Sequence, residues 1–164
     1  MFDTINGIPM HPLIVHGVVV LLPLAILGTI AIAARPTWRA RYGYVVLGIA
    51  VVATALVPAA TQSGEAFEKR VGDAGRHREL GDQLIWFALP LLVLAIALVV
   101  LDRRAAANPG GTGINGAMAV NVVAALAVLA AIAAGYQVYR VGDSGARAAW
   151  CGQGQPAYSC TRTQ

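Results

Sequence analysis

The sequence predicts an all-α integral membrane protein, a four-helix bundle, and three observations support this fold class. First, 57% of the 164 residues are hydrophobic and only 12% are charged, about half the charged fraction of a soluble domain. Second, four uncharged apolar runs are each about 20 residues long, the length that crosses a hydrocarbon core about 30 Å thick. Third, every Asp, Glu, Lys and Arg lies outside these runs. This composition excludes intrinsic disorder, and twelve scattered basic residues argue against a nucleic-acid partner.

The apolar runs predict four spans within a transmembrane domain of residues 1–147, in the order 12–34, 44–61, 83–101 and 116–139. The first run is longer than the apolar part of a signal peptide and follows no basic segment, so we expect a permanent span. Pro23 and Pro90 each free a backbone carbonyl and predict bends. The fourth run is rich in alanine, which lets membrane helices approach closely. A soluble bundle would need polar helix faces, which these runs lack.

A hexapeptide repeat suggests that the bundle contains two related halves. The sequence RVGDAG at residues 70–75 recurs as RVGDSG at 140–145, with five of six positions identical. Each copy follows one predicted pair of spans, so the sequence predicts two parallel helical-hairpin repeats. The glycines are expected to permit a turn out of the preceding helix. Asp73 and Asp143 are expected to cap the helix that follows; the alternative for them is a bond to a histidine or an arginine.

The charges and the cysteines predict an orientation. The short connections 35–41 and 102–113 carry five basic residues and one acid, whereas the other side carries seven of each. The density of basic residues near the helix ends favours the short connections as cytoplasmic. Cys151 and Cys160 lie in the polar tail 148–164, which favours a disulfide in an oxidising compartment over free thiols or a metal site. We therefore expect a multi-pass protein with both termini and segment 62–82 extracytoplasmic.

Three histidines, His11, His16 and His77, all fall on that predicted outer side. Ionisable residues at membrane depth are costly and tend to be functional, and imidazole ligates haem iron, iron, copper and zinc. We expect two of the three to hold haem b near the outer face, with His16 and His77 as candidates facing each other from different halves. A small Cu, Zn or Fe ion is one alternative. The other is a purely structural role, in which a neutral histidine only packs against a neighbouring helix. Oxygen atoms that could support either centre come from Gln62, Glu65, Asp73, Asp82 and Asp143.

The opening segment IPMHPLIVH at residues 8–16 runs into an apolar helix containing Leu22 and Pro23. Together with QSGE at 62–65 and His77 before Leu80 and Gly81, it resembles the bacterial membrane family called domain of unknown function 2231. The resemblance covers nearly the whole chain and implies a bacterial cytoplasmic membrane protein. Relatives fused to Rieske or cytochrome c-like domains imply membrane electron transfer, and the matching positions are the three histidines. This chain has no Cys-x-x-Cys-His and no Rieske pair, so a redox partner would be a separate protein.

Three hypotheses follow, and the first is preferred. A small haem b protein would relay electrons between a quinone or another membrane donor and an exported acceptor, as an electron-transfer protein rather than a stand-alone enzyme. Second, the same histidines could serve metal binding or metal transport. Third, the chain could be a cofactor-free assembly subunit, surrounded by membrane lipids, whose alanine-rich fourth helix binds a partner or a second copy as a homodimer.

Overall fold

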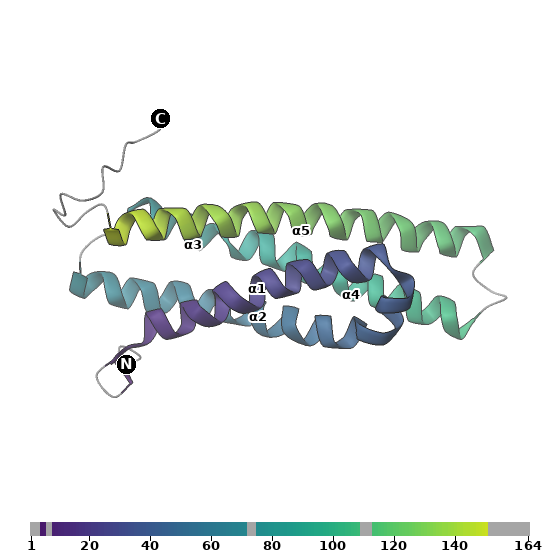
Figure 1. Cartoon of the computed structure of the whole chain (residues 1–164), viewed down its shortest axis with the longest axis horizontal. Helices are drawn as coiled ribbons and strands as arrows, with labels where there is room; N and C mark the ends of the chain where they lie inside the picture. The colour runs from purple at the N-terminus through teal and green to yellow at the C-terminus, as the bar shows by residue number, and fades with distance from the viewer. Residues whose placement is uncertain (1–3, 6–7, 72–74, 109–112, 151–164) are drawn as a thin grey trace.

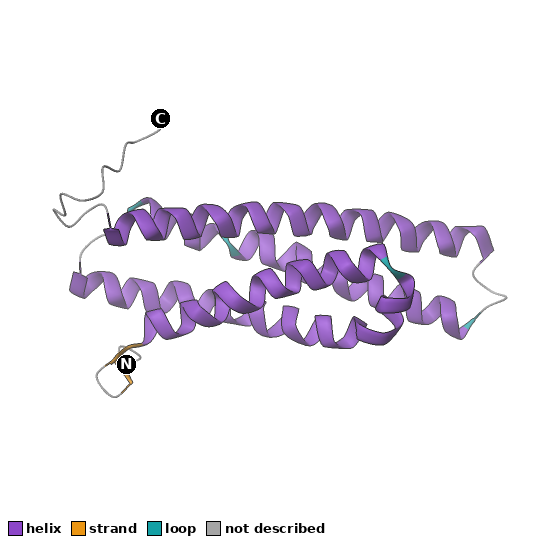
Figure 2. Ribbon diagram, in the orientation of Figure 1, coloured by secondary structure: helices purple, strands orange, loops and turns teal. Residues whose placement is uncertain are grey.

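A computed structural model of the chain describes residues 4–5, 8–71, 75–108 and 113–150, and nearly all of these residues are helical (Figure 2). A short antiparallel pair of strands, β1 (Thr4–Ile5) and β2 (Ile8–Pro9), precedes the bundle. The helices then follow in chain order as α1 (Met10–Ala34), α2 (Pro36–Val71), α3 (Arg76–Gln83), α4 (Ile85–Ala107) and α5 (Gly113–Trp150). The described part of the chain is therefore all-α apart from the two short strands.

The long helices lie side by side in one elongated bundle with two distinct ends (Figure 1). At one end, on the left of Figure 1, α1 and α3 begin and α2 and α5 end; we call it the histidine end. At the other end α1 meets α2 at Arg35 and α4 stops at Ala107; we call it the arginine end. Helix α1 packs against α2 and α5, and α4 packs against α5 and α2. The first hairpin, α1 and α2, therefore contacts the second, α4 and α5, through both of its helices.

Four helical segments are long and apolar enough to cross a membrane: Met10–Ala34, Pro36–Lys69, Arg76–Ala107 and Gly116–Trp150. The expected number of spans is thus confirmed, but the helices extend beyond the apolar runs. Residues 36–41, expected as part of the connection 35–41, already belong to α2, and α5 continues eleven residues past the fourth run, to Trp150. Helix satisfies the backbone hydrogen bonds within one segment, so it continues through polar sequence at the membrane boundary.

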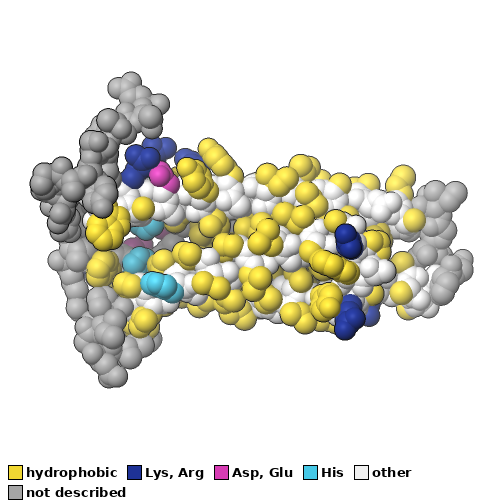
Figure 3. Space-filling view, in the orientation of Figure 1, with side chains coloured by type: hydrophobic (Ala, Val, Ile, Leu, Met, Phe, Trp, Pro, Cys, Tyr) yellow, Lys and Arg dark blue, Asp and Glu magenta, His cyan; other side chains and the backbone are white. Residues whose placement is uncertain are grey.

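The interior of the bundle is built from two clusters of buried apolar side chains. One joins all four spans and includes Leu22, Val57, Leu91 and Ala131; the other lies nearer the arginine end. Several fully buried positions are alanines, including those at 127, 131 and 134 of α5, and small residues permit close helix packing. Hydrophobic side chains also cover much of the outer face (Figure 3), as a surface in contact with hydrocarbon requires.

Arg39 fastens the arginine end from inside. Its side chain is only 3% exposed, and it donates hydrogen bonds to the carbonyls of Ile32 (2.9 Å) and Ala33 (3.1 Å). It also pairs with Asp102 of α4 at 3.2 Å. The last carbonyls of a helix lack intrahelical partners. Arg39 therefore satisfies the end of α1 and links it to the second hairpin, in addition to adding positive charge.

The two copies of the hexapeptide do not occupy equivalent positions. The second copy lies inside α5, where Asp143 pairs with Arg147 at 2.8 Å, so the expectation that Asp143 caps a following helix is wrong. Residues 72–74 of the first copy, including Asp73, lie outside the described residues. The copies diverge at their final glycine: Gly75 has a φ of 53° and precedes α3, whereas Gly145 stays helical ahead of helix-favouring alanines.

Candidate functional site

His11, on the first turn of α1, is held by the end of α2. Its Nδ1 atom lies 3.1 Å from the carbonyl oxygen of Ala60 and 3.2 Å from Oγ of Ser63. A carbonyl oxygen can only accept, so Nδ1 carries a proton, and in the neutral imidazole Nε2 is then the nitrogen with the lone pair. The Ser63 hydroxyl in turn donates to Ala60 at 3.0 Å. The ring of Phe67 stacks on the imidazole, with the two centroids 5.9 Å apart.

His77, on the first turn of α3, has the same set of contacts with the end of α5. Its Nδ1 atom lies 3.1 Å from the carbonyl oxygen of Val141 and 3.2 Å from Oγ of Ser144. The Ser144 hydroxyl donates to Val141 at 2.9 Å. We call these two arrangements the histidine clamps. In each, an imidazole lies at the start of one hairpin, and the last helix of that hairpin (α2 or α5) supplies a serine and the carbonyl three residues before it.

A glycine after each serine makes room for the imidazole. A Cβ atom placed at Gly64 would lie 3.1 Å from Cε1 of His11, and one at Gly145 would lie 2.9 Å from Cε1 of His77. Both distances are shorter than ordinary carbon–carbon contact, which is about 3.5–4.0 Å. The Ser-Gly dipeptide therefore provides both the hydrogen-bond partner and the space that each clamp requires.

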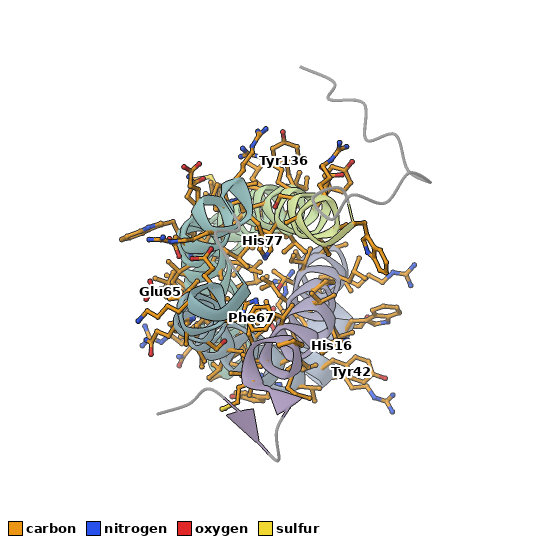
Figure 4. All side chains as sticks on the ribbon, turned by 90° about the vertical axis from the view of Figure 1, so that its left-hand side faces the viewer. His16, Tyr42, Glu65, Phe67, His77 and Tyr136 are labelled. Carbon is orange, nitrogen blue, oxygen red and sulfur yellow. The ribbon has the colours of Figure 1, made fainter. Side chains whose placement is uncertain are left out.

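The clamps lie together at the histidine end. Figure 3 shows the histidine side chains gathered there, and Figure 4 shows His77 and Phe67 toward the middle of the ring of helices. Along α2, Ser63 is about 28 Å from Tyr44 at 1.5 Å per residue, close to the thickness of the hydrocarbon core. The clamps and Tyr44 are therefore separated by about the thickness of a hydrocarbon core.

The other expected site residues take no part in the clamps. His16 is exposed, its Nδ1 atom bonds to the carbonyl of Pro12 one turn earlier in α1, and Figure 4 places it apart from His77. Gln62, Glu65 and Asp82 are exposed as well. Cys151 and Cys160 lie outside the described residues. Among the residues that the structure describes, no group of three or more His, Cys, Asp or Glu side chains is arranged to hold a metal ion.

Gln137 is a structural residue that the sequence reasoning missed. It is fully buried in α5, and its Nε2 donates to the carbonyl of Leu80 at 2.9 Å. That carbonyl is free because the backbone N–H of Leu84, its partner in a regular helix, bonds to Gly81 where α3 gives way to α4. The available signal was an amide near the end of the fourth apolar run, which also contains Asn121 near its start. For Ser63 and Ser144, the signal was the Ser-Gly dipeptide that follows each predicted hairpin.

The chain was compared with protein families, curated proteins and solved structures. Neither the curated proteins nor the solved structures yielded a significant match. One family, described as "Predicted membrane protein (DUF2231)", matches residues 7–155, a stretch that contains both clamps and all four candidate spans. The chain therefore belongs to the DUF2231 family of predicted membrane proteins.

Proposed function

We propose that the chain is a small membrane redox protein in which His11 and His77 would hold haem b. The observation that carries this proposal is the shared tautomer of the two histidines: each donates Nδ1–H to a backbone carbonyl. Metal-ligating histidines almost always donate their second N–H in this way, which fixes the ring and raises the basicity of the ligating nitrogen. Within the described residues, neither Nε2 atom has a hydrogen-bond partner.

The donor set favours haem over a small ion. Two imidazoles suffice for haem iron, because the porphyrin supplies the other four nitrogens. A zinc ion needs four ligands, or three and a water, and the described residues offer no cluster of three suitable side chains. When bound, haem would supply a one-electron change between ferric and ferrous iron. The chain would hold the two imidazoles, and Phe67 beside His11 would help to exclude water.

The pairing differs from the one that the sequence favoured. His16 and His77 were expected to face each other, but His16 is exposed and bonds within its own helix. His11 has the same set of contacts as His77, with a backbone carbonyl and a serine hydroxyl at Nδ1. His11 is therefore the proposed partner of His77.

The matching clamps also support the proposal that the bundle is two parallel hairpin repeats. In each half a histidine enters at the start of the first long helical segment, and a Ser-Gly dipeptide receives it near the end of the second. The packing is reciprocal as well, since each hairpin contacts the other through both of its helices. In this arrangement the two ligands come from equivalent positions of the two halves.

We further propose that the histidine end faces outward. The arginine end carries five basic residues and one acid, and basic residues near helix ends favour the cytoplasmic side. Trp38, Tyr42 and Tyr44 are exposed there, at the level where aromatic anchors meet the membrane boundary. A haem near the opposite boundary would pass electrons from a quinone or another membrane donor to an exported acceptor.

The test is haem uptake by the full chain purified in detergent and titrated with haemin. We expect a Soret band and a sharp reduced α-band, with about one haem per chain. His11→Ala and His77→Ala should each abolish the six-coordinate spectrum, whereas His16→Ala, the matched control on α1, should keep it. No uptake of haemin by the wild-type chain, or an unchanged spectrum in either clamp variant, would overturn the proposal. Stoichiometric Cu, Zn or Fe that is lost in the clamp variants without haem would support the metal-binding alternative.

A further inference from the structure

A groove on the bundle surface lies at the arginine end, far from the histidine clamps. It runs between α2 and α4, and its lining divides into two parts. The part toward the middle of the bundle is apolar, made by Leu47, Val99 and Val100. The part toward the helix ends is cationic and aromatic, made by Arg103, Arg104 and Tyr44. One surface feature thus passes from hydrocarbon-like to positively charged along the direction in which a membrane changes from acyl chains to headgroups.

The local packing holds this groove in shape. Helices α2 and α4 approach closely at Gly43, where an added Cβ would lie 3.0 Å from the side chain of Val99. The guanidinium of Arg103 lies 4.9 Å from the centre of the Tyr44 ring and donates to the carbonyl of Ala40. Arg103 is therefore fastened to α2 at the mouth of the groove through two contacts, each of which leaves further N–H donors on the guanidinium.

The arginine end has an excess of positive charge, which favours binding of an anion. Asp102 is the one acid in the connections there, and Arg39 already pairs with it at 3.2 Å. Within the described residues, no hydrogen bond or ion pair engages the side chain of Arg104. Arginine presents a planar fork of donors that suits phosphate oxygens, and basic pockets between membrane helices on the cytoplasmic side bind anionic lipid headgroups.

We propose that the groove between α2 and α4 binds one anionic phospholipid, with the phosphate at Arg103 and Arg104 and an acyl chain along Leu47, Val99 and Val100. The apolar part of the groove favours a phospholipid over a free phosphate ester, because the ester has no acyl chain to contact it. The phosphate would complete the hydrogen bonding of two guanidinium groups, and the acyl chain would cover exposed valine. The site is independent of the histidine clamps and requires no cofactor.

The experiment uses the full chain in detergent and counts bound lipid by native mass spectrometry. Phosphatidylglycerol is titrated against phosphatidylcholine with the same acyl chains, and glycerol 3-phosphate serves as the free phosphate probe. We expect one phosphatidylglycerol to be retained at least fivefold more strongly than phosphatidylcholine. Neutralising one arginine of the groove lining should weaken retention of phosphatidylglycerol about fivefold, because one basic residue at a membrane surface contributes about 1 kcal/mol.

Matched variants separate a site from general charge attraction. Arg104→Gln should weaken retention of phosphatidylglycerol, whereas Arg41→Gln, an equal charge change at the same end outside the groove lining, should not. Val100→Phe should block the acyl chain, whereas Val93→Phe, on the exposed face of α4, should not. Equal retention of the two lipids, equal loss in Arg41→Gln, or competition by glycerol 3-phosphate as strong as that by the lipid would each overturn the proposal.

Discussion

The clamp around His77 predicts opposite effects for one substitution made at two glycines of α5. At Gly142, no atom lies within 4 Å of an added Cβ, whereas at Gly145 the added Cβ would lie 2.9 Å from Cε1 of His77. Alanine is a better helix former than glycine by about 1 kcal/mol. Gly142→Ala should therefore raise the free energy of unfolding by up to about 1 kcal/mol.

Gly145→Ala gains the same helix propensity but disrupts the contacts of His77 with Val141 and Ser144. The new methyl group must push the imidazole away from both Nδ1 partners on α5, since the helix backbone cannot yield as easily as a side chain. Overpacking costs about 1–3 kcal/mol, and a lost hydrogen bond costs about 1 kcal/mol. The free energy of unfolding of Gly145→Ala should thus be about 2–4 kcal/mol lower than that of Gly142→Ala.

The assay is reversible unfolding of the full chain in mixed micelles, followed by tryptophan fluorescence and circular dichroism. A second pair repeats the comparison in α2: Gly64→Ala, with its Cβ 3.1 Å from His11, against Gly48→Ala, which meets no atom within 4 Å. Gly64→Ala should again have the lower free energy of unfolding, and its difference from Gly48→Ala should be smaller because the added Cβ is less crowded. If the two members of each pair unfold within about 0.5 kcal/mol of each other, the clamps do not constrain the histidines, and the reasoning fails.

Two further predictions concern the buried polar side chains that fasten the hairpins. Gln137→Leu should lower the free energy of unfolding by about 1–2 kcal/mol in the same assay, because the buried carbonyl of Leu80 in α3 loses the side-chain donor that it has among the described residues; Asn121→Leu, at an exposed position of α5, should change the free energy of unfolding little. Arg39→Met should lower it by about 2–3 kcal/mol, since three acceptors are left unpaired, whereas Arg41→Met should lose less than 1 kcal/mol. Equal losses in either variant and its control would refute the role assigned to that side chain.

The sequence determined the number and order of the spans, because burial in hydrocarbon is decided by the length of an apolar run and needs no tertiary partner. It did not determine where the helices end. The polar residues that follow Thr61 and Tyr139 remain helical in α2 and α5, and local composition cannot distinguish a helix that emerges into water from a loop.

From the sequence alone, His16 and His77 were the candidate pair, whereas the structure gives matching contacts to His11 and His77. His16 was the most conspicuous histidine because apolar residues surround it; in the structure its side chain is exposed. Its direction follows from the rotation of α1, which is set by packing against α2 and α5 and leaves no mark in the local sequence. The final glycines of the two hexapeptide copies differ for a related reason: Gly75 precedes α3, whereas Gly145 lies within α5.

By itself, then, the sequence determined that the chain is a membrane protein, how many helices could span the membrane, and at which end of the bundle the histidines lie. Each of these depends on the sum of local transfer free energies. The tertiary structure decided which two histidines share the same contacts, which serines and carbonyls bond to them, and which arginine is buried. Those choices depend on contacts between residues about fifty to sixty-seven positions apart. Such contacts exist only once the hairpins have packed and the rotation of each helix about its own axis is fixed.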